Sequence, residues 1–327
     1  MSKGVIIIIN ETISNRLKKW VEENRSHIAL GEPAQYIPAL AEQDPNQLGI
    51  CIMDYNGESY FAGDIDCHFT LQSISKILSF IAVCHYHGLN HVLSVVDVEP
   101  TGESFNSIIP FEIHRPGKPF NPLINAGAIK VSSILPGDTV DDKYEYLISF
   151  LAQFIDKRLE MDEVIYQSEW ETAHRNRALA YYLKESNQLD IDVEEALGIY
   201  IRQCSIQINL EDLAKIGLII AYDGYDPIKQ KQIFSKEIAQ IAKVLMVTCG
   251  MYNSSGKFAA FVGVPAKSGV SGGILAAVPP KWHSEEEVFK KGCGIAVFSP
   301  AIDISGNSAA GTMLLKQISK ELDFSIF

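Results

Sequence analysis

Apolar residues recur with helical spacing along much of the chain. Ile74, Ile77, Leu78 and Ile81 share one face of a predicted helix over 73–87, which Gly88 would end. The same spacing, with capping residues such as Asp192 and Asn209, predicts further helices. Those helices cover 10–25, 141–155, 168–184, a stretch after Asp192, 210–223, 236–248 and 307–322. Ser168 and Glu171 form a possible capping box at the start of the helix over 168–184.

Strand patterns occur near both ends of the chain. Residues 48–53 and 59–62 flank Asn56-Gly57, which suits a two-residue hairpin turn with positive φ. Residues 273–278 and 294–299 read as two more strands, and 101–136, rich in Pro, Gly and Asn, as an irregular cover over a site.

This distribution predicts the α+β class, with one antiparallel sheet built from both chain ends and flanked by helices. We expect a single catalytic domain over 1–327. Its sheet lobe would span about 1–70 and 250–327, and its helical lobe about 71–249.

Composition narrows the classes of protein that remain. Of 327 residues, 47% are hydrophobic and 21% charged, so the chain can bury a core. The net charge of −12 argues against nucleic acid as a partner, because phosphate binding needs clustered Lys and Arg. The longest apolar runs, 5–9 and 77–84, fall short of the ~18–20 residues that span a bilayer.

Localisation is predicted from two features. The run 5–9 is too short for a signal peptide and lacks a cleavage site, so we expect it to pack on the core. The six cysteines are scattered without a CxxC pair, which is typical of thiols in a reducing cytosol. Both features indicate a cytoplasmic protein without a membrane anchor.

The chemistry of the chain is most visible at Ser73 and Lys76. Residues three apart share a helix face, so Lys76 can reach the Ser73 hydroxyl and act as its base if burial lowers the lysine pKa. The motif is weak by itself, because Ser254 and Lys257 repeat it and a solvated helix also explains it.

A second element lies at 265–273, where Lys267-Ser268-Gly269 precedes a strand. It can present a cation and a hydroxyl beside a nucleophile, and its glycines let backbone N–H groups approach a ligand. An early Ser-x-x-Lys with a late Lys-[Ser/Thr]-Gly is the pattern of serine penicillin-recognising enzymes.

Further stretches go beyond that pattern, and together they resemble the serine-dependent glutaminases of the β-lactamase/transpeptidase-like fold, from about residue 31 to residue 311. These stretches are 31–38, 69–72 leading into Ser73, 119–129, Glu169 with Arg175-Asn176, Tyr200 with Gln203-Cys204-Ser205, Met251-Tyr252 with Ser255-Gly256, and 265–273. The resemblance implies hydrolysis of L-glutamine to L-glutamate and ammonia, without a metal or organic cofactor, by a homotetramer.

The resemblance also implies roles for individual residues. Ser73 would attack the side-chain amide, with Lys76 as base and Tyr252 as proton relay, although Tyr252 itself remains an alternative base. Glu169 would bind the substrate ammonium, and Val270 would add its N–H to an oxyanion hole. Additional contacts to the amino-acid end would come from Asn125, Asn176 and Tyr200, with Tyr36 and Lys267 as possible further site residues.

Several alternatives stay open at this point. Glu169 is also explained as a first-turn helix charge, and Tyr200 and Tyr252 as core aromatics. A β-lactamase or penicillin-binding hydrolase, or a non-catalytic amino-acid-binding protein, fits the same scaffold. A metal site at His85, His87 and His91 is disfavoured, because Gly88 should end the helix between His87 and His91.

Overall fold

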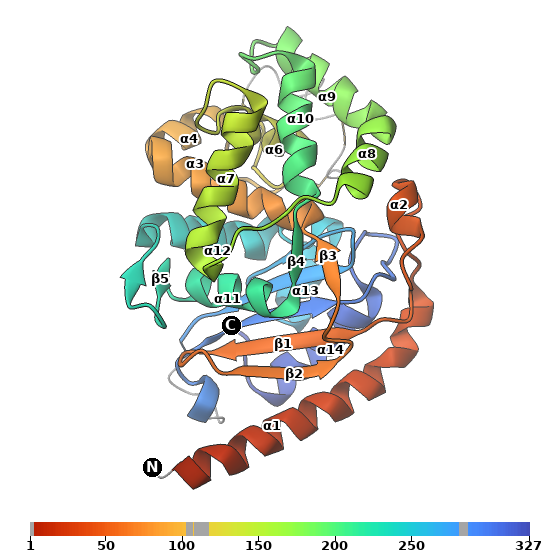
Figure 1. Ribbon diagram of the computed structural model, residues 1–327, viewed down its shortest axis with the longest axis vertical. Coiled ribbons are helices and arrows are strands. Elements are labelled where there is room, and N and C mark those ends of the chain that lie inside the picture. The colour runs from red at the N-terminus through yellow and green to blue at the C-terminus, as the bar shows by residue number, and fades with distance from the viewer. Residues whose placement is uncertain (1–2, 103–106, 108–117, 281–286) are drawn as a thin grey trace.

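A five-stranded antiparallel sheet is built from both ends of the chain (Figure 1). The computed structural model describes residues 3–102, 107, 118–280 and 287–327. The strand order is β2-β1-β9-β8-β7, so the N-terminal hairpin pairs directly with a C-terminal strand, as predicted. The strands are β1 (Gly49–Asp54), β2 (Ser59–Gly63), β7 (Ala266–Ser268), β8 (Gly273–Val278) and β9 (Cys293–Phe298).

Both faces of the sheet are buried because alternate side chains meet different helices. Ile50 and Ile52 contact the core beneath α1 (Lys3–Asn24) and α14 (Ala309–Glu321), whereas Cys51 and Met53 belong to the core beneath α11 (Leu210–Ala221). Helix α11 approaches the sheet so closely that a Cβ atom at Gly294 would lie 1.8 Å from the Ala214 carbonyl oxygen. Although α11 falls within 71–249, it therefore packs on the sheet (Figure 1).

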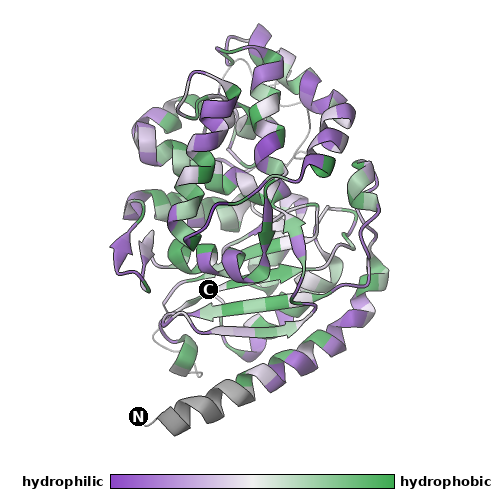
Figure 2. Ribbon diagram, viewed as in Figure 1, coloured by the Kyte–Doolittle hydropathy of each residue, from purple (hydrophilic) through white to green (hydrophobic). Residues whose placement is uncertain are grey.

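Most of the remaining helices pack together on the far side of α11, whereas α12 lies beside α11 and also contacts β7. The buried helix α3 lies among α6, α7, α10 and α12, and the outward turns of these helices carry most of the hydrophilic residues (Figure 2). They are α3 (Ser75–His87), α4 (Leu89–Val95), α6 (Asn125–Ser133), α7 (Val140–Ile155), α8 (Glu163–Thr172), α9 (His174–Glu185), α10 (Val193–Cys204) and α12 (Lys236–Cys249).

Short elements connect these layers. They are η1 (Arg25–Leu30), α2 (Pro38–Ala41), β3 (His68–Thr70), η2 (Gln72–Ile74), β4 (Gln207–Asn209), β5 (Tyr225–Asp226), β6 (Lys231–Gln232), η3 (Tyr252–Ser254), α13 (Ser255–Phe261) and η4 (Glu287–Phe289). Within the described ranges, no helix is long and apolar enough to cross a membrane.

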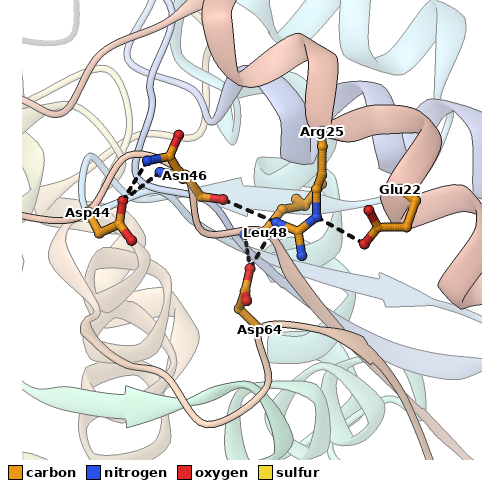
Figure 3. Close-up of polar contacts among 6 residues, drawn as sticks. All are labelled: Glu22, Arg25, Asp44, Asn46, Leu48 and Asp64. Atoms are coloured by element: carbon orange, nitrogen blue, oxygen red, sulfur yellow. Dashed lines mark hydrogen bonds and ion pairs between the residues drawn. The ribbon is translucent and has the colours of Figure 1, made fainter.

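A polar cluster fixes the end of α1 to the sheet (Figure 3). The Arg25 guanidinium donates to Glu22 at 3.0 Å, to the Asn46 carbonyl at 3.1 Å and to Asp64 at 3.0 Å. Asp64 also accepts the Leu48 N–H at 2.8 Å, so one carboxylate joins the helix to the start of the first hairpin.

Most predicted elements are confirmed, including the Asp192 and Asn209 caps and the glycine at the end of α3. One helix was predicted wrongly: Ser168 does not open it, because Asp162 caps α8 and the chain breaks at Ala173 before α9. Ser168 instead lies inside α8 and accepts the Ala39 N–H at 3.1 Å.

Three smaller predictions need correction. Helix α1 begins at Lys3 rather than near Asn10, and the predicted packing of 5–9 lies outside the described side chains. The hairpin turn spans four residues, and of Asn56-Gly57 only Gly57 has positive φ. The segment 101–136 contains α6, although much of it (103–106 and 108–117) lies outside the described residues.

Candidate active site

Ser73 and Lys76 lie side by side at the start of α3. Ser73 occupies the 3-10 turn η2, and Lys76 follows in the first turn of the α-helix. Both side chains are buried, with Ser73 7% exposed and Lys76 fully enclosed. The second Ser-x-x-Lys does not resemble this arrangement, because Lys257 is exposed and Ser254 bonds to Ser305 on the surface side.

The Lys76 amine is held by a side-chain acceptor and by a backbone acceptor. Nζ donates to Asn125 Oδ1 at 2.6 Å and to the Leu123 carbonyl at 3.4 Å, and it lies 5.8 Å from the centre of the Tyr200 ring. Burial lowers the pKa of Lys76 to about 8, although nearby Cys204 and Glu169 act in the opposite direction. A substantial fraction of this lysine is therefore neutral near physiological pH.

Asn125 connects the lysine to the helices that carry the other predicted binding residues. Its Nδ2 donates to Asn176 Oδ1 at 2.8 Å, which joins α3, α6 and α9 in one chain of polar contacts. Tyr200 lies on α10, buried next to Cys204, and burial holds its pKa well above the ordinary value.

Glu169 lies inside α8 as a buried carboxylate, not in the exposed first turn of a helix. Burial raises its pKa to about 7, while a hydrogen bond from Gln72 and the charge of Lys76 oppose that rise. The Gln72 Nε2 atom donates to Glu169 Oε2 at 3.2 Å. A buried carboxylate with one neutral donor is suited to receive a cationic group.

Tyr252 lies against the nucleophile. Its hydroxyl forms a hydrogen bond with the Ser73 side chain and donates to the Ser268 carbonyl at 3.2 Å. Its backbone adopts φ 49°, an unusual conformation for a residue with a large side chain. Burial raises the pKa of Tyr252 above its ordinary value, so the phenol is protonated near neutrality.

Lys267 lies behind Tyr252 on β7. Its Nζ is 4.4 Å from the centre of the Tyr252 ring and donates to the Ser268 carbonyl at 2.6 Å. Burial and the charge of Lys76 hold the pKa of Lys267 well below its ordinary value. Lys267 therefore lies close enough to Lys76 for the charge of one amine to disfavour the charge of the other.

Val270 and Tyr36 border a hollow at the surface. The hollow has a volume of about 630 Å³ and is lined by 29–36, Val270 and 302–306. Val270 packs in one cluster with Tyr252 and Ile302, and the neighbouring Gly269 lies against the turn that carries Ser73. Tyr36 is 57% exposed, and burial together with nearby Tyr252 and Glu169 raises its pKa above the ordinary value.

The structure also brings two residues into the site that the sequence did not assign. Gln72 contacts Glu169, and the Cys204 thiol lies 3.9 Å from the Ser75 hydroxyl and bonds to Tyr200. Burial raises the pKa of Cys204, which keeps it a thiol. Two signals in the sequence could have found them: Gln72 directly precedes Ser73, and Cys204 follows Tyr200 by about one helical turn.

The histidines near the end of α3 take a different role. The His87 ring contacts the Ile134 carbonyl at 2.8 Å and lies beside His91. Among the residues that the structure describes, no group of three or more His, Cys, Asp or Glu side chains is arranged to hold a metal ion.

The whole arrangement can be compared with known proteins. The sequence pattern of the glutaminases matches residues 31–327. The chain belongs to the glutaminase family. It is 58% identical to Glutaminase 2 of Bacillus cereus over 311 residues, which cover 95% of each protein, and 56% identical to Glutaminase 1 of Bacillus subtilis.

Solved glutaminase structures share the fold. A Bacillus subtilis probable glutaminase superposes with a TM-score of 0.91 at 54% identity, covering 96% of this chain and 97% of that one. The covalent complex of a Bacillus subtilis glutaminase with 5-oxo-L-norleucine gives a TM-score of 0.87 at 51% identity, covering 96% and 99%. These relationships confirm the predicted β-lactamase-like fold and the predicted class, an amidohydrolase that acts as a glutaminase.

Proposed function

We propose that this glutaminase hydrolyses L-glutamine through an acyl-enzyme on Ser73, with Lys76 as the general base. The observation that carries the proposal is the environment of the Lys76 amine. The amine is fully buried one turn after Ser73, and burial lowers its pKa to about 8, so a neutral amine that can accept the Ser73 proton is present near neutral pH. Hydrogen bonds from Nζ to Asn125 and to the Leu123 carbonyl hold the amine in this place.

The reaction then has two halves. The Ser73 Oγ attacks the side-chain amide carbon while Lys76 takes the hydroxyl proton, and the oxyanion is bound by the N–H groups of Ser73 and Val270. The C–N bond breaks, and Tyr252 passes a proton to the departing ammonia. Water then attacks the acyl ester, giving L-glutamate and restoring the serine.

Lys76 suits the role of base better than Tyr252. An efficient base has a pKa near the working pH, and burial brings the pKa of Lys76 to about 8. The pKa of Tyr252 is raised, so its phenolate is scarce, but its contacts to Ser73 and Ser268 suit a proton relay.

The polar residues near Lys76 can bind the α-ammonium and the α-carboxylate of glutamine. Glu169 is the counter-ion for the α-ammonium, because it is the buried carboxylate of this group. Asn125, Asn176 and Tyr200 offer directional hydrogen bonds to the same end of the substrate, and Tyr36 borders the opening. The covalent complex of the Bacillus subtilis relative with 5-oxo-L-norleucine supports a nucleophile that reacts with a glutamine-shaped ligand.

The proposal is tested by labelling and by substitution. The diazoketone 6-diazo-5-oxo-L-norleucine should modify Ser73, identified by peptide mass spectrometry. Ser73→Ala should abolish ammonia release while thermal unfolding stays unchanged, and Ser254→Ala is the matched control in the other Ser-x-x-Lys. Labelling at Ser254, Ser268 or a cysteine, or turnover by Ser73→Ala, would overturn the assignment.

Substrate class is tested with three compounds in parallel. Glutamine should release ammonia, whereas a chromogenic β-lactam should remain intact. Asparagine is one methylene shorter, so it should release ammonia more slowly than glutamine if its ammonium and its amide must reach Glu169 and Ser73 together. Equal turnover of glutamine and the β-lactam would favour the penicillin-recognising alternative, and binding without turnover would favour a non-catalytic role.

We also propose, from the resemblance alone, that the whole chain is one catalytic unit acting in the cytoplasm as a homotetramer. The 36.2 kDa chain should then sediment at about four times its own mass in analytical ultracentrifugation. A monomer or dimer that retains full activity would contradict this assembly.

A further inference from the structure

Gln72 joins the two ends of the candidate site. It directly precedes Ser73 in η2, and its side chain reaches the Glu169 carboxylate on α8. The nucleophile and the carboxylate therefore meet through a single residue, which itself is only 2% exposed.

The backbone of Gln72 is held in an unfavourable conformation by its neighbours. Its φ is 45°, a region that residues with side chains seldom adopt. The Ser75 hydroxyl donates to the Gln72 carbonyl at 2.7 Å, and the Ser271 hydroxyl donates to the Thr70 carbonyl at 2.6 Å. Gly269 packs so tightly that a Cβ atom there would lie 2.6 Å from the Leu71 carbonyl oxygen.

This backbone conformation aims the amide at Glu169. Nε2 donates to Glu169 Oε2 at 3.2 Å, and it lies 3.5 Å from Thr70 Oγ1. A neutral amide donor favours the ionised form of a carboxylate without itself titrating. The contact also fixes the rotation of the Glu169 carboxylate.

The other groups near Glu169 do not supply this effect in the reactive state. The titratable groups that interact with it are Lys76, Tyr36, Tyr200, Tyr252 and Cys204. The three tyrosines and Cys204 have raised pKa values and are neutral near pH 7. The charge of Lys76 favours the ionised form of Glu169, but Lys76 must be neutral when it acts as the base, so its charge is then absent.

We propose that Gln72 is a positioning residue that orients the Glu169 carboxylate toward the substrate ammonium and keeps it ionised when Lys76 is neutral. This role rests on the proposed function, because it assigns the ammonium to Glu169 and the base to Lys76. Because Gln72 and Ser73 are adjacent in η2, the residue that orients Glu169 and the nucleophile lie on the same turn.

The test compares two competitive inhibitors that differ by one group. L-Glutamate carries the α-ammonium and glutarate does not, so only L-glutamate reports on the state of Glu169. The inhibition constants are measured from pH 5.5 to 8 in the wild type, Gln72→Met and Gln203→Met. Met is unbranched like Gln, so it meets the positive φ at a similar steric cost. Gln203 is a buried glutamine on α10, which makes its variant the matched control.

The expected result is specific to the ammonium. Gln72→Met should weaken L-glutamate on the order of tenfold at pH 7 and move the midpoint of its pH profile upward. Glutarate should bind the variant and the wild type alike, and Gln203→Met should change neither inhibitor. Equal weakening of both inhibitors, or an unmoved midpoint, would overturn the role of Gln72.

Two further measurements keep the outcome unambiguous. If Gln72→Met fails to unfold cooperatively, Gln72→Glu replaces it. The added carboxylate repels the charge of Glu169, so the midpoint of the pH profile for L-glutamate should move further upward. An unmoved midpoint in that variant would also overturn the inference. Labelling by 6-diazo-5-oxo-L-norleucine separates this role from the proposed function: an unlabelled Ser73 in the wild type contradicts the catalytic assignment, whereas a labelled Ser73 with unmoved profiles contradicts Gln72 alone.

Discussion

The Lys76 amine donates a 2.6 Å hydrogen bond to Asn125, and Asn125 donates in turn to Asn176. The proposed base is therefore held by the same amide that we expect to contact the amino-acid end of the substrate. A substrate that displaces Asn125 from either partner would also move the lysine. This arrangement links substrate recognition to the geometry of proton transfer.

Replacing Lys76 by Arg should remove acylation rather than preserve it. A guanidinium stays protonated in proteins, so it has no lone pair to accept the Ser73 proton. In the wild type, the single-turnover acylation rate should rise with pH about a midpoint near 8, because the neutral amine becomes more abundant as pH exceeds its pKa. Lys130→Arg, at another buried lysine, is the control. Near-normal acylation by Lys76→Arg would make Tyr252 the base.

Lys267→Gln should lower the acylation rate without moving that midpoint. Burial and the charge of Lys76 hold the pKa of Lys267 well below its ordinary value, which disfavours its charged form, so we expect its removal to take away little positive charge. Its loss would instead release the Ser268 carbonyl and the Tyr252 ring that it contacts. The pH profile of single-turnover acylation distinguishes the two effects. A shift of the midpoint to higher pH would show that Lys267 is charged and repels Lys76.

Glu169→Gln should raise the KM for glutamine tenfold to a hundredfold, because a charge-assisted hydrogen bond contributes about 1.5–3 kcal/mol. The inhibition constant of 4-carbamoylbutanoate, which lacks the α-amino group, should change much less. In the wild type, affinity for L-glutamate should weaken as pH falls through about 7, where the carboxylate gains its proton.

Glu171→Gln provides the matched control for that experiment. Glu171 lies two residues further along α8, is exposed and bonds to Gln167 at 2.8 Å, so its charge is away from the site. KM should remain at the wild-type value in this variant. An equal loss for ligands with and without the ammonium in Glu169→Gln would show that Glu169 does not bind that group.

Arg25→Met should lower the free energy of unfolding by about 1 kcal/mol and leave kcat unchanged. The contacts of Arg25 to Glu22, Asn46 and Asp64 join α1 to the sheet but are partly exposed, where such pairs contribute modestly. Urea denaturation at low and high salt measures the effect, which should shrink with salt. Arg158→Met removes a more exposed pair with Glu145 and should cost less. If Arg158→Met lowers the free energy of unfolding as much as Arg25→Met or more, the structural role of the Arg25 contacts is contradicted.

Local sequence signals determined much of this protein. The caps at Asp192 and Asn209 and the stop at Gly88 need only neighbouring residues, and the structure has all three. The spacing of Ser73 and Lys76 likewise follows from helix geometry. The family resemblance added Tyr252, Glu169 and Val270 as separate motifs, and the structure places them near the Ser73 turn.

Local signals also misled at particular places. Ser168 has the spacing of a capping residue, but Asp162 provides the cap, and tertiary packing turned Ser168 toward Ala39. The Pro, Gly and Asn content around 101–136 favoured an irregular segment, yet α6 forms there because its residues are buried between α3 and α10. Tertiary contacts therefore overrode a local capping signal in the first case and a compositional signal in the second.

Only the tertiary structure decided the electrostatics of the site. The sequence shows that Lys76, Lys267 and Glu169 are ionisable, but burial sets their pKa values, and burial depends on segments distant in the chain. The positive φ of Gln72 likewise has no local signature, because the turn that carries it packs against Gly269 and is held by hydrogen bonds from Ser75 and Ser271. The sequence thus supplied the chemical groups, whereas the packing of distant segments set their charge and direction.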